Sequence, residues 1–274
     1  MCAARAIVAT ALALSTTVFA HAQPPLRLED VRRSLSAYLD SYGQRLAAVV
    51  AEEQYRQVIG QRERNLRSDY ALTRAADKEA WVGYRDTFEV DGKPIRDRED
   101  RLIQLLAGGT TAGAARIADE SSRFNLASTI ITRNINVPTL VLEMLHPRNQ
   151  WRFKISKSGE DVINTTRTWR LDYAERERPT FIRNSNGRDR PTHGSMWVNP
   201  ATGEVWQTLL TWDSDPRGTI IVTYGHAANI DALVPLTMTE RYDVKNSTLT
   251  GDASYSNYRQ FQTGARLVPS PNSR

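Results

Sequence analysis

The sequence predicts an α+β fold, in which a curved antiparallel sheet or half-open β-barrel is covered by N-terminal and central helices. Two observations predict it. Residues 194–261 form a series of segments rich in β-branched and aromatic side chains, separated by Gly, Pro, Asn and Asp turns, which is typical of a meandering sheet. Residues 28–51 instead repeat apolar side chains every three or four positions, as an amphipathic helix does.

The first residues are typical of a secretory signal peptide. Arg5 supplies the positive start, residues 7–19 form a short stretch of apolar or small residues, and Ala20-His-Ala22 matches a cleavage site. The apolar stretch is too short to predict a membrane-spanning helix. We therefore expect a signal peptide over residues 1–22, a single helix-plus-antiparallel-sheet domain over 23–265 and a flexible tail over 266–274.

Composition excludes several classes of function. Cys2 is the only cysteine and lies within the predicted signal peptide, so the mature chain offers neither disulfides nor thiolate catalysis. The formal net charge is +5, and we interpret this small surplus as spread along the chain, because basic runs such as residues 183–190 are interrupted. Nucleic-acid binding needs a concentrated basic surface and is not expected. Because the predicted signal peptide implies export, the expected location is the periplasm or the extracellular space.

The helix predicted over residues 28–51 has a polar face of mixed charge. Binding to a membrane surface would favour a strongly basic face, so packing against the sheet is the preferred interpretation. Two further helices are predicted over residues 97–106 and 111–126, separated by Gly108-Gly109. Residues 138–145 are the most apolar stretch of the mature chain and fit either a short helix or a buried strand.

Strands are predicted on both sides of this central region. Asp91-Gly92 is expected to form a turn, because Gly tolerates positive φ, and residues 200–203 are expected to form another. The strands before the central region are expected at residues 54–59, 67–74 and 80–90, and those after it at 151–155, 167–173, 180–183, 195–199, 204–212, 218–224, 236–242 and 254–261.

No arrangement of catalytic or metal-binding residues is prominent in the sequence. His146, His193 and His226 lie far apart and have none of the short spacings typical of zinc ligands. The chain has no G-x-S-x-G motif, and the closeness of His193 to Ser195 does not by itself predict a nucleophile and its base. An envelope hydrolase built on these two residues is the third hypothesis, and no catalytic residue, cofactor or metal is expected.

Two acid pairs, Glu52-Glu53 and Glu99-Asp100, are the clearest groups of carboxylates in the chain. Neighbouring residues do not share a face of a helix or a strand, so the two side chains of a pair are not placed to act together. We expect both pairs to be solvated surface charge.

The apolar face of the later strands is the feature that points to a function. On the strand interpretation Trp206 and Leu210 share one face of their strand. A large curved sheet must cover such a face with helices or enclose something apolar, and ordinary core packing is the alternative to a cavity. The candidate residues lining a cavity are Trp206, Leu210, Val222, Met238 and Tyr242.

Several parts of the chain together resemble the lipoprotein-localisation carrier superfamily. These are the signal peptide, the helix before the sheet, the hairpin around Gly203, Val-Pro-Leu-Thr-Met at residues 234–238 and the final segment 251–261. The resemblance covers chiefly residues 150–262. It implies an incomplete, strongly curved antiparallel β-barrel that helices close over an apolar cavity for acyl chains. The arginine that helps control cavity opening in that superfamily has no matching motif here, so no functional residue is carried over.

The favoured hypothesis is an exported, non-catalytic binding protein that holds a lipid acyl chain or another hydrophobic ligand in a half-open barrel. The alternative is a structural or protein-interaction module of the cell envelope, with the same fold and a filled core. The expected partner is a hydrophobic small molecule or lipid on the first hypothesis and an envelope protein on the second.

Overall fold

A computed structural model describes residues 26–46, 49–74, 81–95, 119–126, 135–184, 186–228, 230–244 and 246–260. The predicted signal peptide, the predicted tail and the helix predicted over residues 97–106 lie outside these ranges, as does the first half of the helix predicted over residues 111–126. Residues 119–122, within that last prediction, are helical.

The described chain is mostly strand. The helices are α1 (Leu28–Leu46), α4 (Leu140–Met144) and the 3-10 helix η1 (Pro147–Arg152). The strands are β1 (Val49–Ile59), β2 (Arg62–Arg74), β3 (Trp81–Val90), β4 (Lys93–Pro94), β5 (Phe153–Ile163), β6 (Thr166–Glu175), β7 (Ile182–Arg183), β8 (Asp189–Arg190), β9 (His193–Val198), β10 (Val205–Trp212), β11 (Arg217–His226), β12 (Leu233–Val244) and β13 (Ser247–Gln260).

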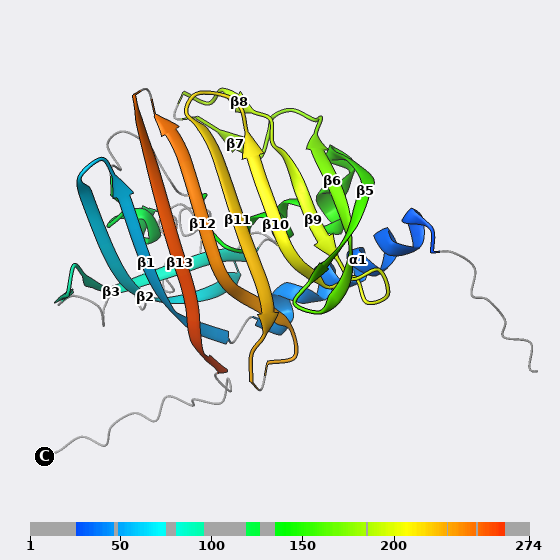
Figure 1. Cartoon of the computed structure of the whole chain (residues 1–274), viewed down its shortest axis with the longest axis horizontal. Helices are drawn as coiled ribbons and strands as arrows, with labels where there is room; N and C mark the ends of the chain where they lie inside the picture. Colours follow the sequence, from blue (N-terminus) through cyan, green and yellow to red (C-terminus); the bar gives the residue numbers. More distant parts are fainter. Residues whose placement is uncertain are drawn as a thin grey trace, which may run out of the picture.

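One antiparallel sheet organises these elements. Its eleven strands follow the order β4-β3-β2-β1-β13-β12-β11-β10-β9-β6-β5, while β7 and β8 form a separate two-stranded sheet. The large sheet curves, and α1 and the short central helices lie against one side of it (Figure 1). The sheet is open, with β4 and β5 as its edges. The predicted fold class, a curved antiparallel sheet covered by N-terminal and central helices, is confirmed.

The first helix ends earlier than its apolar repeat predicts. It stops at Leu46, and Val49 and Ala51, which the prediction placed in the helix, are buried at alternate positions of β1. Two consecutive β-branched valines favour a strand, and the alternation continues to Tyr55 on the same buried face. Pairing of this segment with both β2 and β13 therefore overrides the helical spacing.

Other boundaries follow from proline and from tertiary contacts. Residues 138–145 are resolved in favour of a helix, α4, rather than a strand. The strand expected at 151–155 begins only at Phe153, because Pro147 starts the helix η1, which continues to Arg152. The strand expected at 180–183 is reduced to the two residues of β7.

Both predicted turns are confirmed. Asp91 and Gly92, between β3 and β4, have φ of 50° and 77°, as a tight two-residue hairpin turn requires. Gly203, between β9 and β10, has φ of 78° and lies against the backbone of Ser34 in α1, where a Cβ atom would overlap it. This turn therefore also sets how closely α1 approaches the sheet.

Candidate binding interior between sheet and helices

The five predicted lining residues all lie on the concave face of the sheet. Trp206 and Leu210 are on β10, Val222 is on β11, and Met238 and Tyr242 are on β12. The register pairs Val222 directly with Met238. The five side chains are 0–7% exposed and belong to one hydrophobic cluster that includes residues of α1 and α4. The structure thus brings them together, packed against the protein's own helices.

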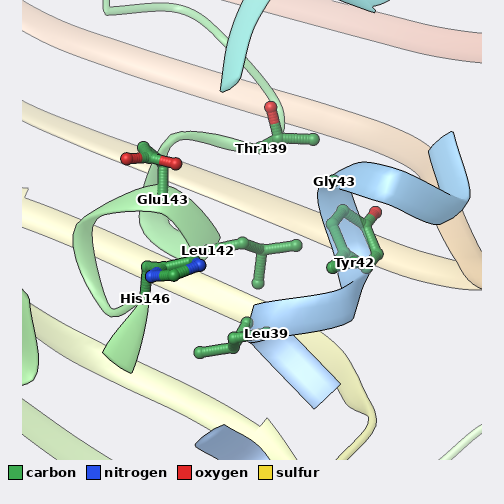
Figure 2. Close-up of a pocket in the computed structure, with 7 residues that line it drawn as sticks. All are labelled: Leu39, Tyr42, Gly43, Thr139, Leu142, Glu143 and His146. Carbon is green, nitrogen blue, oxygen red and sulfur yellow. The ribbon is translucent and has the colours of Figure 1, made fainter. Parts of the chain in front are cut away.

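A small cavity lies between α1 and α4. Its volume is about 20 Å³, which is room for about one water molecule. Figure 2 shows Leu142 of α4 extending towards Tyr42 of α1 across it. The lining residues are Leu39, Tyr42, Gly43, Thr139, Leu142, Glu143 and His146, so none of the five predicted residues borders it.

Several buried polar atoms have no hydrogen-bond partner within the described part of the chain, among them three donors of aromatic side chains on α1 and β10. They are the hydroxyls of Tyr38 and Tyr42 and the indole N–H of Trp206, whose side chains are 3%, 3% and 7% exposed. The two tyrosine rings lie 5.5 Å apart. Burial raises the pKa of both tyrosines, so their hydroxyls stay protonated and able to donate. Unpaired buried donors are uncommon in folded proteins.

The concave face near β1 and β3 contains buried charge instead. The side chains of Glu53 and Arg85 are 0% and 2% exposed and form an ion pair, with Nη2 2.7 Å from Oε1 and Nε close to Oε2. Tyr255 donates its hydroxyl to Glu53 Oε1 at 2.8 Å. Burial opposes the charge of Arg85, but the Glu53 carboxylate raises the pKa of the guanidinium well above its usual value.

The expectation that Glu53 is solvated is therefore wrong. Its neighbour Glu52 lies on the outer face, where it pairs with Arg67 at 2.7 Å. The signal was present in the sequence: Val49, Ala51, Glu53 and Tyr55 occupy alternate positions of one strand, so Glu53 shares a face with apolar residues. The other acid pair, Glu99-Asp100, lies outside the described residues.

A second buried carboxylate, Glu240, lies on β12 and is 3% exposed. It accepts a hydrogen bond from Tyr242 at 2.6 Å and another from Tyr55. Gly251 leaves room for it, because a Cβ atom there would lie 2.5 Å from Glu240 Oε1. The predicted lining residue Tyr242 thus directs its hydroxyl to a carboxylate.

These buried polar side chains attach two central segments to the sheet. Arg85 Nη2 donates to the backbone carbonyl of Asn136 at 3.1 Å. Gln57 donates to Asn125 Oδ1 at 3.2 Å and accepts from the backbone N–H of Leu126 at 2.7 Å. Residues 125, 126 and 136 are therefore held over this half of the concave face by directional hydrogen bonds.

Tyrosine is concentrated in this interior. The chain has 10 tyrosines, of which nine are buried and the tenth, Tyr258, is partly buried against the core. Burial raises the pKa of Tyr70, Tyr173, Tyr224 and Tyr255 as well as that of Tyr38 and Tyr42. The interior therefore presents hydroxyl groups as well as apolar surface.

The residues of the hydrolase hypothesis do not form a catalytic pair. Ser195 donates its hydroxyl to Asp172 Oδ1 at 2.6 Å, while His193 Nδ1 lies 3.8 Å from Asp213 on the exposed surface. Since the serine hydroxyl is directed to Asp172, His193 is not placed to act as its general base in this arrangement.

The other two histidines contact different residues and do not share a site with His193 or with each other. His226 packs edge-on against the Trp206 ring, and His146 Nε2 lies 3.6 Å from Asp40. Across the described ranges, no group of three or more His, Cys, Asp and Glu side chains is placed to hold a metal ion. No helix in those ranges is both long enough and apolar enough to cross a bilayer.

Comparison with known proteins found likeness only among solved structures. No protein-family model matches the chain, and no curated protein matches it. One similar structure is described as an outer membrane lipoprotein-sorting protein domain from Vibrio parahaemolyticus, with 11% identity, 85% of this chain and 95% of that chain covered and a TM-score of 0.41. A LolA superfamily protein from Nitrosomonas europaea has 11% identity, coverages of 84% and 94% and a TM-score of 0.37.

A third similar structure, a DUF1329 family protein from Desulfovibrio piger, has 10% identity, coverages of 87% and 95% and a TM-score of 0.44. One of these similar structures thus has the name of the superfamily that parts of this sequence resemble. Identities and TM-scores this low transfer no function to this chain.

Proposed function

We propose that this chain is an exported, non-catalytic protein that binds a hydrophobic ligand, such as a lipid acyl chain, between the concave face of the sheet and helices α1 and α4. The observation that supports it best is the small cavity between α1 and α4, which is bordered by Tyr42, a residue whose buried hydroxyl has no hydrogen-bond partner in the described part of the chain. The lining residues of the ligand-bound form would be Trp206, Leu210, Val222, Met238 and Tyr242.

Ligand binding requires the helices to move. A cavity of about 20 Å³ is far too small for an acyl chain, so the ligand must displace side chains of α1 and α4 from the sheet. Apolar contacts are not directional, and an acyl chain would replace them with similar contacts. The gain is roughly 25 cal/mol for each Å² of ligand surface buried, less the cost of ordering the ligand.

Few polar contacts oppose such a movement of α1. Gln150 of η1 donates to Ser36 at 3.0 Å, and Arg45 donates to the backbone carbonyl of Asp231 at 3.4 Å. The pair between His146 and Asp40 involves an aspartate whose side chain is 74% exposed. The Gln150–Ser36 hydrogen bond is partly buried, whereas the other two contacts are exposed and contribute little to stability.

The unpaired donors favour an amphiphilic ligand. Tyr38, Tyr42 and Trp206 each present an O–H or N–H group in an apolar setting. An ester or carboxyl oxygen near the start of an acyl chain would accept hydrogen bonds from such donors. A pure hydrocarbon would leave them unpaired, so we expect it to bind more weakly than a fatty acid or glycerolipid of equal length.

Native mass spectrometry of the protein purified from its own host, together with displacement of a fluorescent fatty acid, tests ligand binding. Helix movement is tested by joining Asp40→Cys to His146→Cys with a short bismaleimide, since the native side chains come within 3.6 Å. We expect the joined protein to lose uptake of the probe.

The same double variant without the reagent is the control and should take up the probe as the wild type does. If no lipid copurifies and no probe binds to the wild type, the proposed function is wrong. If the joined protein still takes up the probe, the ligand does not pass between α1 and α4.

The alternative, an envelope interaction module with a filled core, has one observation in its favour, the nearly complete burial of the five predicted lining residues. It predicts that crosslinking in the intact envelope recovers a reproducible protein partner and that the bismaleimide bridge between positions 40 and 146 leaves that partnership unchanged. Recovery of lipid but no partner would contradict it.

A further inference from the structure

One segment of the chain, residues 148–190, has a formal net charge of +5. Residues 148–190 contain 11 Lys and Arg side chains and six Asp and Glu, out of 36 and 31 in the whole chain, so the remaining residues hold 25 of each. Almost all of η1 and the whole of β5, β6, β7 and β8 lie within this segment (Figure 1).

The same region exposes aromatic side chains. Trp151 on η1 is 67% exposed and Phe181, next to β7, is 38% exposed. The guanidinium of Arg152 lies 5.3 Å from the centre of the Trp151 ring and 5.1 Å from that of Phe181. Arg152 also lies 3.8 Å from the buried carboxylate of Glu175. This ion pair fixes the position of the guanidinium that both rings contact.

Three exposed arginines lie in the chain segments next to these rings. Arg176 follows the end of β6 and bonds through its backbone N–H to the carbonyl of Arg152 at 2.8 Å. Arg183 is the second residue of β7, and Arg188 precedes β8. All three are exposed, and none forms an ion pair with another described residue. We call Trp151, Arg152, Arg176, Phe181, Arg183 and Arg188 the aromatic–arginine patch.

We propose that the aromatic–arginine patch docks this protein onto the surface of a bilayer that contains anionic phospholipids. Arginines near such a surface are attracted to the phosphate groups of the lipids, and guanidinium groups bind phosphate oxygens in pairs. Tryptophan prefers the boundary between headgroups and acyl chains, where its ring is apolar and its N–H is polar.

Charge complementarity favours a bilayer over a protein partner. Two exposed rings and three exposed arginines match the apolar boundary and the phosphate groups of a bilayer, which requires no pocket on the protein. This proposal does not depend on ligand binding in the interior, although η1 directly follows α4 and would place the α1–α4 interface close to the membrane.

Co-sedimentation with vesicles tests the proposal. We expect the wild type to bind phosphatidylcholine vesicles that contain phosphatidylglycerol, to bind pure phosphatidylcholine vesicles far more weakly, and to be released by added salt. Replacing Arg176, Arg183 and Arg188 together with Ser should weaken binding to the anionic vesicles on the order of 100-fold. Trp151→Ala should weaken it roughly 10-fold.

The matched controls change three arginines and one exposed apolar side chain outside the aromatic–arginine patch. Replacing exposed Arg33, Arg62 and Arg217 with Ser makes the same change of net charge outside the patch, and Val162→Ala shortens a side chain that is 66% exposed at the far end of β5. Both should bind within about twofold of the wild type.

Quenching of tryptophan fluorescence by brominated lipid provides a second measurement, because Trp151→Phe should remove the quenched component. The proposal is overturned if the control triple variant loses as much binding as the patch variant, or if neutral vesicles bind as well as anionic ones. It is equally overturned if the wild type does not bind vesicles and instead binds an acidic protein in a way that depends on Trp151.

Discussion

The two halves of the concave face are closed in different ways. Near β1 and β3, the Glu53–Arg85 ion pair and amide hydrogen bonds hold residues 125, 126 and 136 on the sheet. Near β10 and β11, α1 and α4 cover the sheet with apolar side chains and leave three donors unpaired. Directional bonds between buried charges permit one arrangement, whereas apolar contacts can be exchanged for those of a ligand. On the proposed function, the first half is the anchor and the second is the half that opens.

High pH should lower the free energy of unfolding more than any other change. The pH at which the buried tyrosines ionise also compares how well the two halves exclude water. Seven tyrosines have a raised pKa because of burial, among them Tyr38 and Tyr42 near the apolar half and Tyr255 near the charged half. A raised pKa in the folded state gives stability that is full below pH 10 or so and is lost as the pH rises further.

Each of these tyrosines lowers the free energy of unfolding by about 1.4 kcal/mol per pH unit above that point, so the seven together remove about 10 kcal/mol per unit. We expect tyrosinate absorbance and loss of far-ultraviolet circular dichroism to rise together in one steep transition. Ionisation of several tyrosines near pH 10 with the circular dichroism unchanged would mean that the apolar half is already open to water.

Breaking the buried ion pair should have the next largest effect. Arg85→Met leaves Glu53 as an uncompensated buried charge and should lower the free energy of unfolding by about 3–5 kcal/mol. Adding Glu53→Leu should recover most of this loss, because a well-packed apolar pair can replace a buried ion pair. Urea unfolding measures both.

Glu52→Ala is the matched control, since Glu52 precedes Glu53 in the chain but pairs on the exposed outer face. Its unfolding curve should almost coincide with that of the wild type. If Arg85→Met behaves like Glu52→Ala, the charged half of the interior is not an anchor.

Removal of single tyrosine hydroxyls should have the smallest effects, and these should differ in sign between the two halves. Tyr255→Phe deprives Glu53 of a hydrogen bond at 2.8 Å and should cost about 1.5–3 kcal/mol. Tyr42→Phe removes a buried hydroxyl without a partner and should be neutral or stabilise the protein by up to about 1 kcal/mol. Thermal unfolding of the two variants measures the difference, and equal losses would show that Tyr42 has a partner in solution.

Local patterns determined much of this architecture. Alternation along single strands predicted β10, β11 and β12 and the shared inward face of Trp206 and Leu210, because a strand needs only its own sequence to set which side chains share a face. Glycine in the sequences around Gly92 and Gly203 predicted turns, because glycine tolerates positive φ, and both residues have positive φ in the structure. The same local argument, applied to Val49 through Tyr55, would have placed Glu53 on the buried face.

Only the tertiary structure decided where α1 ends and what surrounds each buried group. β1 pairs with β13, so Glu53 meets Tyr255 across some 200 positions of sequence, and no local period reports which strands become neighbours. Arg85 comes from β3 and Glu240 from β12, and their burial depends on partners from other elements. The sequence by itself determined which faces are apolar; tertiary packing decided that one half of the interior is closed by charge and the other by helices, because buried charges are tolerated only where distant segments supply their partners.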